Sequence, residues 1–180
     1  MSQVRLYTAM SLDGFVADSD GDSTWLEPYQ NSFFDQSRFL DSIGAVVLGR
    51  RTCQMVQAFG EWPYPDKSAF ILSSQRPWAV PVGAHIVPHG IVAAVQSARE
   101  CTSKDVWIVG GAVTMQSALE AGLVDIVEIC IAPYLIGSGL SLLNSLEKQQ
   151  KLEFDGIHAF TDGMVKLRYD VVRSQRISGR

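Results

Sequence analysis

The sequence predicts an α/β fold: a three-layer sandwich with a mostly parallel central sheet and an antiparallel hairpin at its C-terminal edge. Short apolar runs alternate with segments of helical periodicity through the first two thirds of the chain. This alternation is typical of parallel strands joined by crossover helices. The last third carries two strand-like runs joined by Thr161-Asp162-Gly163, and Asp-Gly is a hairpin signal. The parallel sheet should therefore end in an antiparallel pair.

The individual elements follow from periodicity and from the Gly and Pro residues that bound them. Strands are expected over residues 4–9, 43–48, 68–72, 85–87, 106–109, 126–132, 152–160 and 164–172. Helices are expected over residues 31–40, 52–58, 92–100 and 113–121. Gly60 and Gly122 follow two of these helices, as glycine commonly does at a helix C-terminus.

Length and composition indicate one domain. A chain of 180 residues, 47% hydrophobic and 19% charged, can bury a sizeable core. We expect residues 1–173 to form this domain and residues 174–180 to form a polar tail. The net charge of -4 and the lack of a basic run argue against nucleic acid or an anionic membrane as a partner. Neither a membrane span nor a signal peptide is recognisable, so we expect a cytoplasmic protein.

No metal site is predicted. The three cysteines lack CxxC spacing, which argues against a zinc site and against a disulfide framework. The acidic stretch Asp18–Asp22 resembles a calcium loop but lacks the glutamate that such a loop requires, so we expect a turn there. His85 and His89 are separated by a proline that argues against a common helix face.

In open parallel sheets, ligands bind at the carboxyl ends of strands, where loops lead into helix N-termini. Three such junctions in this chain have unusual chemistry. The first consists of Gly49, Arg50, Arg51 and Thr52, directly after an apolar strand. A helix that begins there presents free backbone N–H groups and the positive end of its dipole, next to two guanidinium groups and a hydroxyl. This combination suits a phosphate.

The second junction places two hydroxyls and an arginine after the strand 68–72. Its residues are Leu72, Ser73, Ser74 and Arg76. Charge-assisted hydrogen bonds from such side chains can hold the phosphate of a ribose. An ordinary solvated turn is the alternative interpretation.

The third junction has two glycines, Gly110 and Gly111, between a strand and the helix start at residues 112–114. Glycines permit tight turning and the close approach of a pyrophosphate. The GxGxxG spacing of the ordinary dinucleotide-binding fold is absent. Any one junction is also compatible with an ordinary loop, but all three follow strands and should meet at one edge of the sheet.

Six motifs occur in order along almost the whole chain. They are A-M-S-L-D-G-F-V-A at 9–17, T-W-L at 24–26, L-G-R-R-T at 48–52, I-L-S-S-Q at 71–75, V-G-G-A at 109–112 and P-Y-L-I-G-S-G at 133–139. Together they resemble the dihydrofolate reductase-like superfamily. In particular, they resemble the family of the C-terminal reductase domain of the bifunctional riboflavin-biosynthesis deaminase-reductase.

The resemblance implies NADPH as the cofactor. It places Ala9 and Val16 near the nicotinamide, the first junction on phosphates, the second on the adenosine 2'-phosphate and the third on the pyrophosphate. The implied cofactor-binding residues are Ala9, Val16, Gly49, Arg50, Arg51, Thr52, Leu72, Ser73, Ser74, Arg76, Gly110, Gly111, Ala112, Val113 and Thr114.

The resemblance also implies hydride transfer to a small nitrogen heterocycle, either a pteridine or a ribosylaminopyrimidine-like substrate. The specific case is a riboflavin-biosynthesis type 5-amino-6-(5-phosphoribosylamino)uracil reductase. Dihydrofolate reductase activity is one alternative, and a non-catalytic nucleotide-binding module is another. A homodimer is expected, since related domains often pair through the C-terminal sheet region.

The catalytic residues are less well defined. Trp25 is expected either to line the substrate cleft or to pack in the core. A true dihydrofolate reductase uses a carboxylate on its first helix, but spacing places Phe33 at that position, and Asp35 is the only acid nearby. Asp35 is therefore the first candidate for the proton donor, with a solvent-facing role as its alternative, and Asp13 and Tyr64 are the others.

Overall fold

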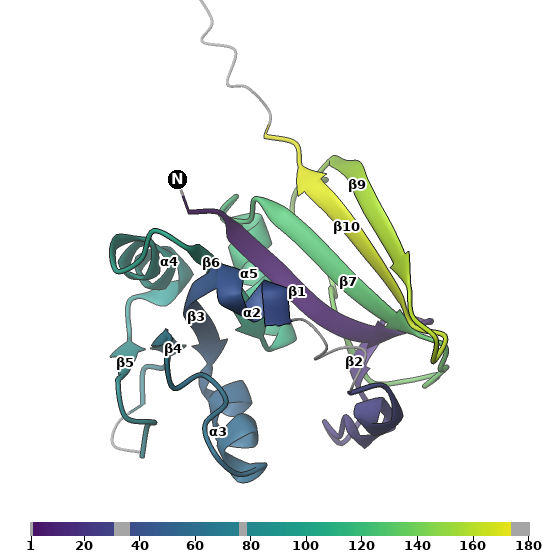
Figure 1. Cartoon of the computed structure of the whole chain (residues 1–180), viewed down its shortest axis with the longest axis horizontal. Helices are drawn as coiled ribbons and strands as arrows, with labels where there is room; N and C mark the ends of the chain where they lie inside the picture. The colour runs from purple at the N-terminus through teal and green to yellow at the C-terminus, as the bar shows by residue number, and fades with distance from the viewer. Residues whose placement is uncertain (1, 31–36, 76–78, 174–180) are drawn as a thin grey trace, which may run out of the picture.

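Eight strands form one sheet in the computed structural model, which describes residues 2–30, 37–75 and 79–173 (Figure 1). The order across the sheet is β5-β4-β3-β6-β1-β7-β10-β9. All neighbours from β5 to β7 are parallel, whereas β10 is antiparallel to both β7 and β9. The strands are β1 Val4–Ser11, β3 Ile43–Gly49, β4 Ser68–Leu72, β5 Ala84–Val87, β6 Asp105–Gly110, β7 Ile126–Ala132, β9 Leu152–Ala159 and β10 Val165–Val171.

Helices cover both faces of this sheet, which confirms the predicted three layers. Helices α4 and α5 pack on one face, while α2 and the buried side of α3 join the core on the other face. The helices are α2 Ser37–Ser42, α3 Arg50–Ala58, α4 Gly90–Glu100 and α5 Ala112–Glu120, and the 3-10 helix η1 spans Thr24–Tyr29. None of the helices in the described part of the chain is long and apolar enough to cross a membrane.

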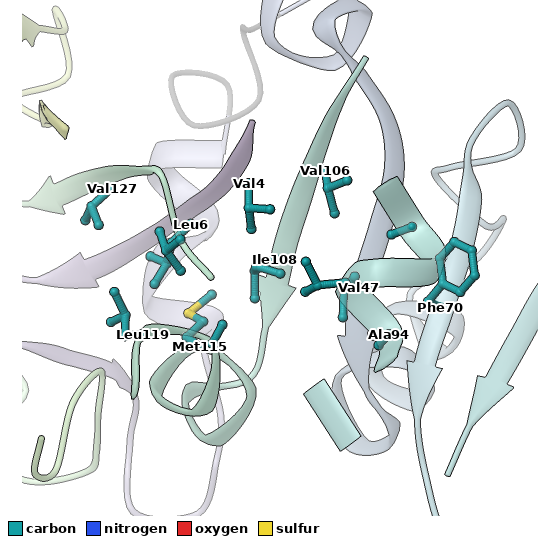
Figure 2. Packing of buried hydrophobic residues seen from close by; sticks show 14 of the residues in the cluster. Val4, Leu6, Val47, Phe70, Ala94, Val106, Ile108, Met115, Leu119 and Val127 are labelled. Atoms are coloured by element: carbon teal, nitrogen blue, oxygen red, sulfur yellow. The ribbon is translucent and has the colours of Figure 1, made fainter. Parts of the chain in front are cut away.

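One core lies between the sheet and helices α4 and α5. Figure 2 shows Val4 and Leu6 of β1 and Ile108 of β6 on the same side of the sheet as Met115 and Leu119 of α5. These side chains are buried, and the strands that carry them are almost continuously apolar. Continuous apolar strands are expected in a parallel sheet, because both of its faces are covered.

The second core, on the opposite face, is built around aromatic rings. Tyr7 lies 4.5 Å from Phe39 and 6.0 Å from Trp107 between ring centroids, and Tyr64 lies 5.5 Å from Trp107. The indole Nε1 of Trp107 donates to the carbonyl oxygen of Tyr7 at 2.9 Å. Burial raises the pKa of both the Tyr7 and the Tyr64 phenols, so both stay neutral.

A buried ion-pair network lies on the same face as this aromatic core. Arg5 donates to Glu128 Oε2 from Nε at 2.9 Å and from Nη2 at 2.5 Å, and from Nη1 to Ser42 Oγ at 2.9 Å. Arg168 bridges Glu128 and Asp155, with N–O distances of 3.3 Å and 2.5 Å. Glu128 is only 1% exposed, and its buried carboxylate is paired with these two arginines instead of with water. The network connects strands β1, β7, β10 and β9.

The predicted C-terminal hairpin is confirmed, and its turn has the expected chemistry. Gly163 has a φ of 92°, in the region that favours glycine, and its N–H donates to Phe160 O at 3.1 Å. The side chain of Asp162 accepts the N–H of Met164 at 3.1 Å. The hairpin therefore turns through Asp-Gly as the sequence indicates.

Three features differ from the prediction. A two-stranded sheet pairs β2 Phe15–Ala17 with β8 Leu140–Ser141, and η1 is a helical segment within the expected loop region. Both are too short to show periodicity. Strand β1 extends two residues beyond the predicted end, to Ser11, because it pairs with β7 up to Ala132. The predicted helix 31–40 lies mainly outside the described residues, as does the tail 174–180, and the described end of the helix continues to Ser42.

Replacing Glu128 with alanine should strongly destabilise the fold. The change leaves the Arg5 guanidinium buried without its main partner, for which we expect a loss of about 3–5 kcal/mol in the free energy of unfolding. Chemical denaturation measures this loss. The exposed Glu147→Ala variant serves as the control and should change stability by less than about 0.5 kcal/mol. A loss below about 1 kcal/mol for Glu128→Ala would contradict the proposed importance of the network.

The three thiols should differ sharply in reactivity. Burial raises the pKa of Cys53 to about 11 and the pKa of Cys130 to about 11, whereas Cys101 is exposed. Since the thiolate is the reactive form, a thiol reagent at about pH 8 should label Cys101 quickly and the other two slowly. Labelling in denaturant provides the control, where all three cysteines should react alike. Equal rates in the native protein would show that the two buried thiols are accessible.

Candidate functional site

The three predicted junctions lie at the ends of adjacent strands. Those after β3 and β6 lead into helices α3 and α5, whereas β4 is followed by strand β5 and not by a helix. Strand β3 stands between β4 and β6, with Gly49 paired to Leu72 of β4 and Leu48 paired to Gly110 of β6. Because these strands are parallel, their carboxyl ends meet at one edge of the sheet. The structure therefore brings together the residues that the sequence singled out at the ends of β3, β4 and β6.

A hollow of about 380 Å³ opens at the ends of β4 and β5. It is lined by Arg50, Leu72, Ser73, Ser74, Gln75, Val87, Pro88 and Gly90. Among the described residues of this lining, half-buried Arg50 is the only one with a charged side chain, and the others offer two hydroxyls and an amide. Ser73 Oγ accepts the N–H of Gln75 at 3.2 Å, which shapes the turn after β4. A hollow with one cation, hydroxyls and no carboxylate is suited to an anionic group.

Two helices begin at this edge without a side-chain cap. Helix α3 begins immediately after Gly49, and helix α5 begins immediately after Gly111. Their first backbone N–H groups have no partner within the helix, and each helix directs the positive end of its dipole toward the edge. Within the described residues, neither Arg50 nor Arg51 of α3 forms an ion pair. This part of the site therefore carries positive charge that is not neutralised by a neighbouring carboxylate.

Glycines allow these two helix starts to pack closely. A Cβ on Gly49 would lie 2.8 Å from Thr114 Oγ1, and a Cβ on Gly111 would lie 3.1 Å from Thr52 Oγ1. Gly110 has a φ of 140°, in the region that favours glycine, and precedes a cis peptide bond to Gly111. The glycines thus let two threonine hydroxyls approach the backbone where α3 and α5 begin.

The remaining predicted residues have clear positions. Ala9 is buried and lies near the carboxyl end of β1. Val16 of β2 packs against the core that contains residues of α5. Ala112 is half-buried and Val113 is exposed in the first turn of α5. Asp35 and Arg76 lie outside the described residues.

The carboxylate of Asp13 links the loop after β1 to the loop after β7 by hydrogen bonds. It accepts the hydroxyl of Ser11 at 2.6 Å and the backbone N–H groups of Ile136 at 3.1 Å and Gly137 at 2.7 Å. These hydrogen bonds, with that from Ser11 the largest influence, lower the pKa of Asp13. A lowered pKa makes Asp13 a poor proton donor near neutral pH.

Trp25 of η1 lies against the aromatic side of the core. Its ring stacks on Tyr134 with centroids 5.9 Å apart and planes 21° from parallel. It packs against the same cluster of side chains that contains Ala9 and Tyr64. The indole Nε1 is buried and has no hydrogen-bond partner within the described part of the chain.

Three residues that line the hollow were not singled out in the sequence. They are Val87, Pro88 and Gly90, which come from the junction between β5 and α4. The signal in the sequence is H-I-V-P-H-G at 85–90, a fourth short strand that ends in a helix start. The predicted strand 85–87 was correct, but its end was not recognised as a site.

Comparisons with known proteins agree with this architecture. The model of the RibD C-terminal domain family matches residues 2–166. The uncharacterized protein YwjB of Bacillus subtilis (strain 168) is 28% identical over 169 residues, which is 91% of this chain and 95% of YwjB.

Solved structures give the same result. The crystal structure of a candidate riboflavin biosynthesis protein from Shewanella sp. PV-4 is 27% identical, has a TM-score of 0.83, and the match covers 95% of this chain and 99% of that chain. Dihydrofolate reductase from Enterococcus faecalis, in complex with NADP(H), is 15% identical, with a TM-score of 0.65 and coverage of 94% and 96%. The second likeness shows the fold alone.

Three observations agree. The sheet is parallel with an antiparallel C-terminal edge, the three junctions lie on adjacent strands, and the family model matches residues 2–166. The chain belongs to the RibD C-terminal domain family and has a dihydrofolate reductase-like fold.

Proposed function

We propose that this protein is an NADPH-dependent reductase of a small nitrogen-heterocyclic substrate. The observation that carries the proposal is the row of anion-binding features along adjacent strands β4, β3 and β6. A dinucleotide phosphate has several separate anionic groups, and this edge offers separate places for them. One is the hollow beside Arg50, and the others are the starts of α3 and α5.

We expect the hollow to hold the adenosine 2'-phosphate, which NADPH carries and NADH lacks. Arg50 is the charged group there, and the hydroxyl of Ser74 would add a hydrogen-bond donor, whereas the hydroxyl of Ser73 donates to Gln75 O at 3.1 Å. Hydrogen bonds to charged groups are about twice as strong as neutral ones, so the phosphate should add to affinity. Gly49, Gly110 and Gly111 would let the pyrophosphate approach the backbone between the two helix starts.

When bound, NADPH supplies the hydride, and the protein must position the reacting groups and exclude water. Ala9, with its small side chain at the end of β1, leaves room for a ring at the centre of the sheet edge. Asp13 holds the loop 11–14 against residues 134–137, so that this loop can cover a bound ligand. Trp25, stacked on Tyr134, would supply an apolar wall for a flat substrate.

The substrate class follows from the family and from the aromatic wall. A pteridine or a ribosylaminopyrimidine-like compound is flat, as stacking on Trp25 requires. The Shewanella relative supports a reductase of the riboflavin-biosynthesis type as the first case to test. Tyr64 is an unsuitable proton donor because it is buried and its pKa is raised. A bound water and Asp35, which lies outside the described residues, are the remaining candidates.

The loss of reduced-nicotinamide absorbance tests the proposal directly. Purified protein should oxidise NADPH when a ribosylaminopyrimidine or a reducible pteridine is added, and not in its absence. Binding of NADPH without oxidation by any of these acceptors would favour a nucleotide-binding module. Failure to bind NADPH would refute the proposed function altogether.

Replacing Arg50 with alanine should weaken NADPH binding more than NADH binding. The guanidinium faces the hollow where the additional phosphate would lie, and NADH lacks this phosphate. We expect a loss of roughly tenfold or more for NADPH, equivalent to ~1.4 kcal/mol, and a smaller loss for NADH. The exposed Lys148→Ala variant, which removes one positive charge elsewhere, should leave both affinities unchanged. Equal losses for the two cofactors in Arg50→Ala would contradict this role.

Replacing Gly49 with alanine should weaken the binding of NADPH and NADH to the same extent. The added Cβ would meet Thr114 Oγ1 at 2.8 Å, which displaces the start of α5 from α3. The pyrophosphate is common to NADPH and NADH, so both affinities should fall by roughly tenfold or more, ~1.4 kcal/mol. Calorimetric titration measures the affinities, and a thermal melt separates a binding defect from unfolding. Unchanged binding of both cofactors would exclude the pyrophosphate from this junction.

A further inference from the structure

Two basic side chains lie opposite each other on the C-terminal hairpin, outside the network around Glu128. Lys166 of β10 pairs with His158 of β9 in the register of the sheet, so their side chains share a face. Lys166 is half-buried and His158 is exposed. Neither forms an ion pair with any residue that the structure describes. Two basic groups placed opposite each other repel whenever both are charged, which favours an anion between them.

The carboxylates beside this pair already have cationic partners. Glu128 accepts hydrogen bonds from Arg5 and Arg168. Arg168 also pairs with Asp155 in the bulge of β9, where the register with β10 shifts. The two guanidinium groups are thus matched by the two carboxylates. Within the described part of the hairpin, the ammonium group of Lys166 is left without a counter-charge.

The basic pair lies in the same row of the sheet as Ala9. Ala9 of β1 pairs with Cys130 of β7, and Cys130 pairs with Lys166 of β10. Because paired residues share a face, the side chains of this row, His158 included, project from the same side of the sheet. Neighbouring strands are about 4.8 Å apart, which puts Lys166 roughly 10 Å and His158 roughly 14 Å from Ala9 along the row.

The charge of Lys166 acts on the neighbouring strand β7. Burial raises the pKa of Cys130 to about 11, whereas the hydrogen bond with Tyr7 and the charge of Lys166 act in the opposite direction. Cys130 stands directly between Lys166 and Ala9 in the row. The positive charge is therefore felt one strand away from the position where the cofactor ring is proposed to lie.

The aromatic wall proposed for the substrate belongs to this face too. Trp25 of η1 packs against the cluster of side chains that contains Ala9 and Cys130. His158 meets Phe160 edge-on, with ring centroids 4.5 Å apart, and Phe160 packs against the same cluster. A flat ring near Ala9 therefore has an apolar wall beside it and two basic groups about 10 Å and 14 Å away on one side.

We propose that Lys166 and His158 form a subsite for an anionic substituent of the substrate, a phosphate or a carboxylate carried about 10 Å from the ring that accepts the hydride. The inference rests on the proposed function, which places that ring near Ala9. Lysine binds an anion as a point charge on a flexible stem, and a protonated imidazole adds a charge-assisted donor. Binding energy from this remote group would hold the ring in position for hydride transfer.

Ribose 5-phosphate, which carries a phosphate without the ring, tests the subsite apart from catalysis. It is titrated into protein saturated with NADPH, so that the proposed cofactor site is filled, and the imidazole signals of the three histidines are followed by NMR. The His158 signal, assigned with His158→Gln, should shift saturably, whereas the signals of His85 and His89 should not. Ribose at the same concentration should shift none of them.

A charge-removing variant identifies the group that holds the probe. Lys166→Met keeps the length of the side chain and removes its charge, so it should weaken the binding of ribose 5-phosphate at least tenfold. The matched control Lys148→Met removes the charge of an exposed lysine elsewhere and should leave this binding unchanged. No shift of the His158 signal in the wild-type protein, or equal affinity in Lys166→Met, would overturn the proposal. Circular dichroism checks that each variant is folded.

Steady-state oxidation of NADPH distinguishes a phosphate from a carboxylate. Two matched pairs of acceptors are compared: a ribosylaminopyrimidine with and without its phosphate, and a reducible pteridine with and without a carboxylate arm. The anionic member of one pair should have a KM at least tenfold lower than its neutral counterpart, and this preference should disappear in Lys166→Met and persist in Lys148→Met.

The outcomes separate this inference from the proposed function. Oxidation of NADPH with equal KM for the anionic and neutral members of both pairs would overturn the subsite and leave the reductase function intact. Failure to bind NADPH would refute the reductase function. Titration of the cofactor-free protein with ribose 5-phosphate would then still decide the subsite through the His158 signal.

Discussion

Close packing between the starts of α3 and α5 is the constraint on which the candidate site depends. Gly49 and Gly111 lack the side chain that would separate them, and Thr52 and Thr114 occupy the space instead. Because β3 and β6 are neighbours in the sheet, the two helix starts then present their unpaired N–H groups to the same region. The proposed site for a long anionic ligand depends on this strand order and glycine placement, with the hollow beside Arg50 at one end of the row.

A second constraint connects the first strand of the chain to the C-terminal hairpin. Arg5 and Arg168 approach Glu128 from strands on either side of β7, and Arg168 also holds Asp155 in the bulge of β9. One buried carboxylate thus links the first strand of the chain to the last two. The C-terminal hairpin and the proposed cofactor edge therefore belong to one continuous sheet.

Much of this arrangement could be predicted from the sequence because it depends on local signals. Parallel strands appear as apolar runs, and the Arg50 and Gly110 junctions appear as polar or glycine residues directly after such runs. Contacts between distant segments could not be predicted in this way. Asp13 was named only as a candidate proton donor, whereas its hydrogen bonds to Ile136 and Gly137 cross more than 120 positions of sequence. The pairing of β9 with β10 likewise shifts register beside Asp155, between the pairs Phe154–Tyr169 and Gly156–Arg168, and no local pattern in the sequence indicates this shift.

Calorimetric titration of the wild-type protein with NADPH and, separately, with NADH tests the central claim most directly. The proposed row of phosphate-binding features, with the hollow beside Arg50 at one end, predicts saturable NADPH binding that is at least tenfold tighter than NADH binding, a difference of ~1.4 kcal/mol. Equal affinities would show that the hollow beside Arg50 does not hold the additional phosphate. No binding of either cofactor would mean that the edge formed by β4, β3 and β6 serves a different ligand.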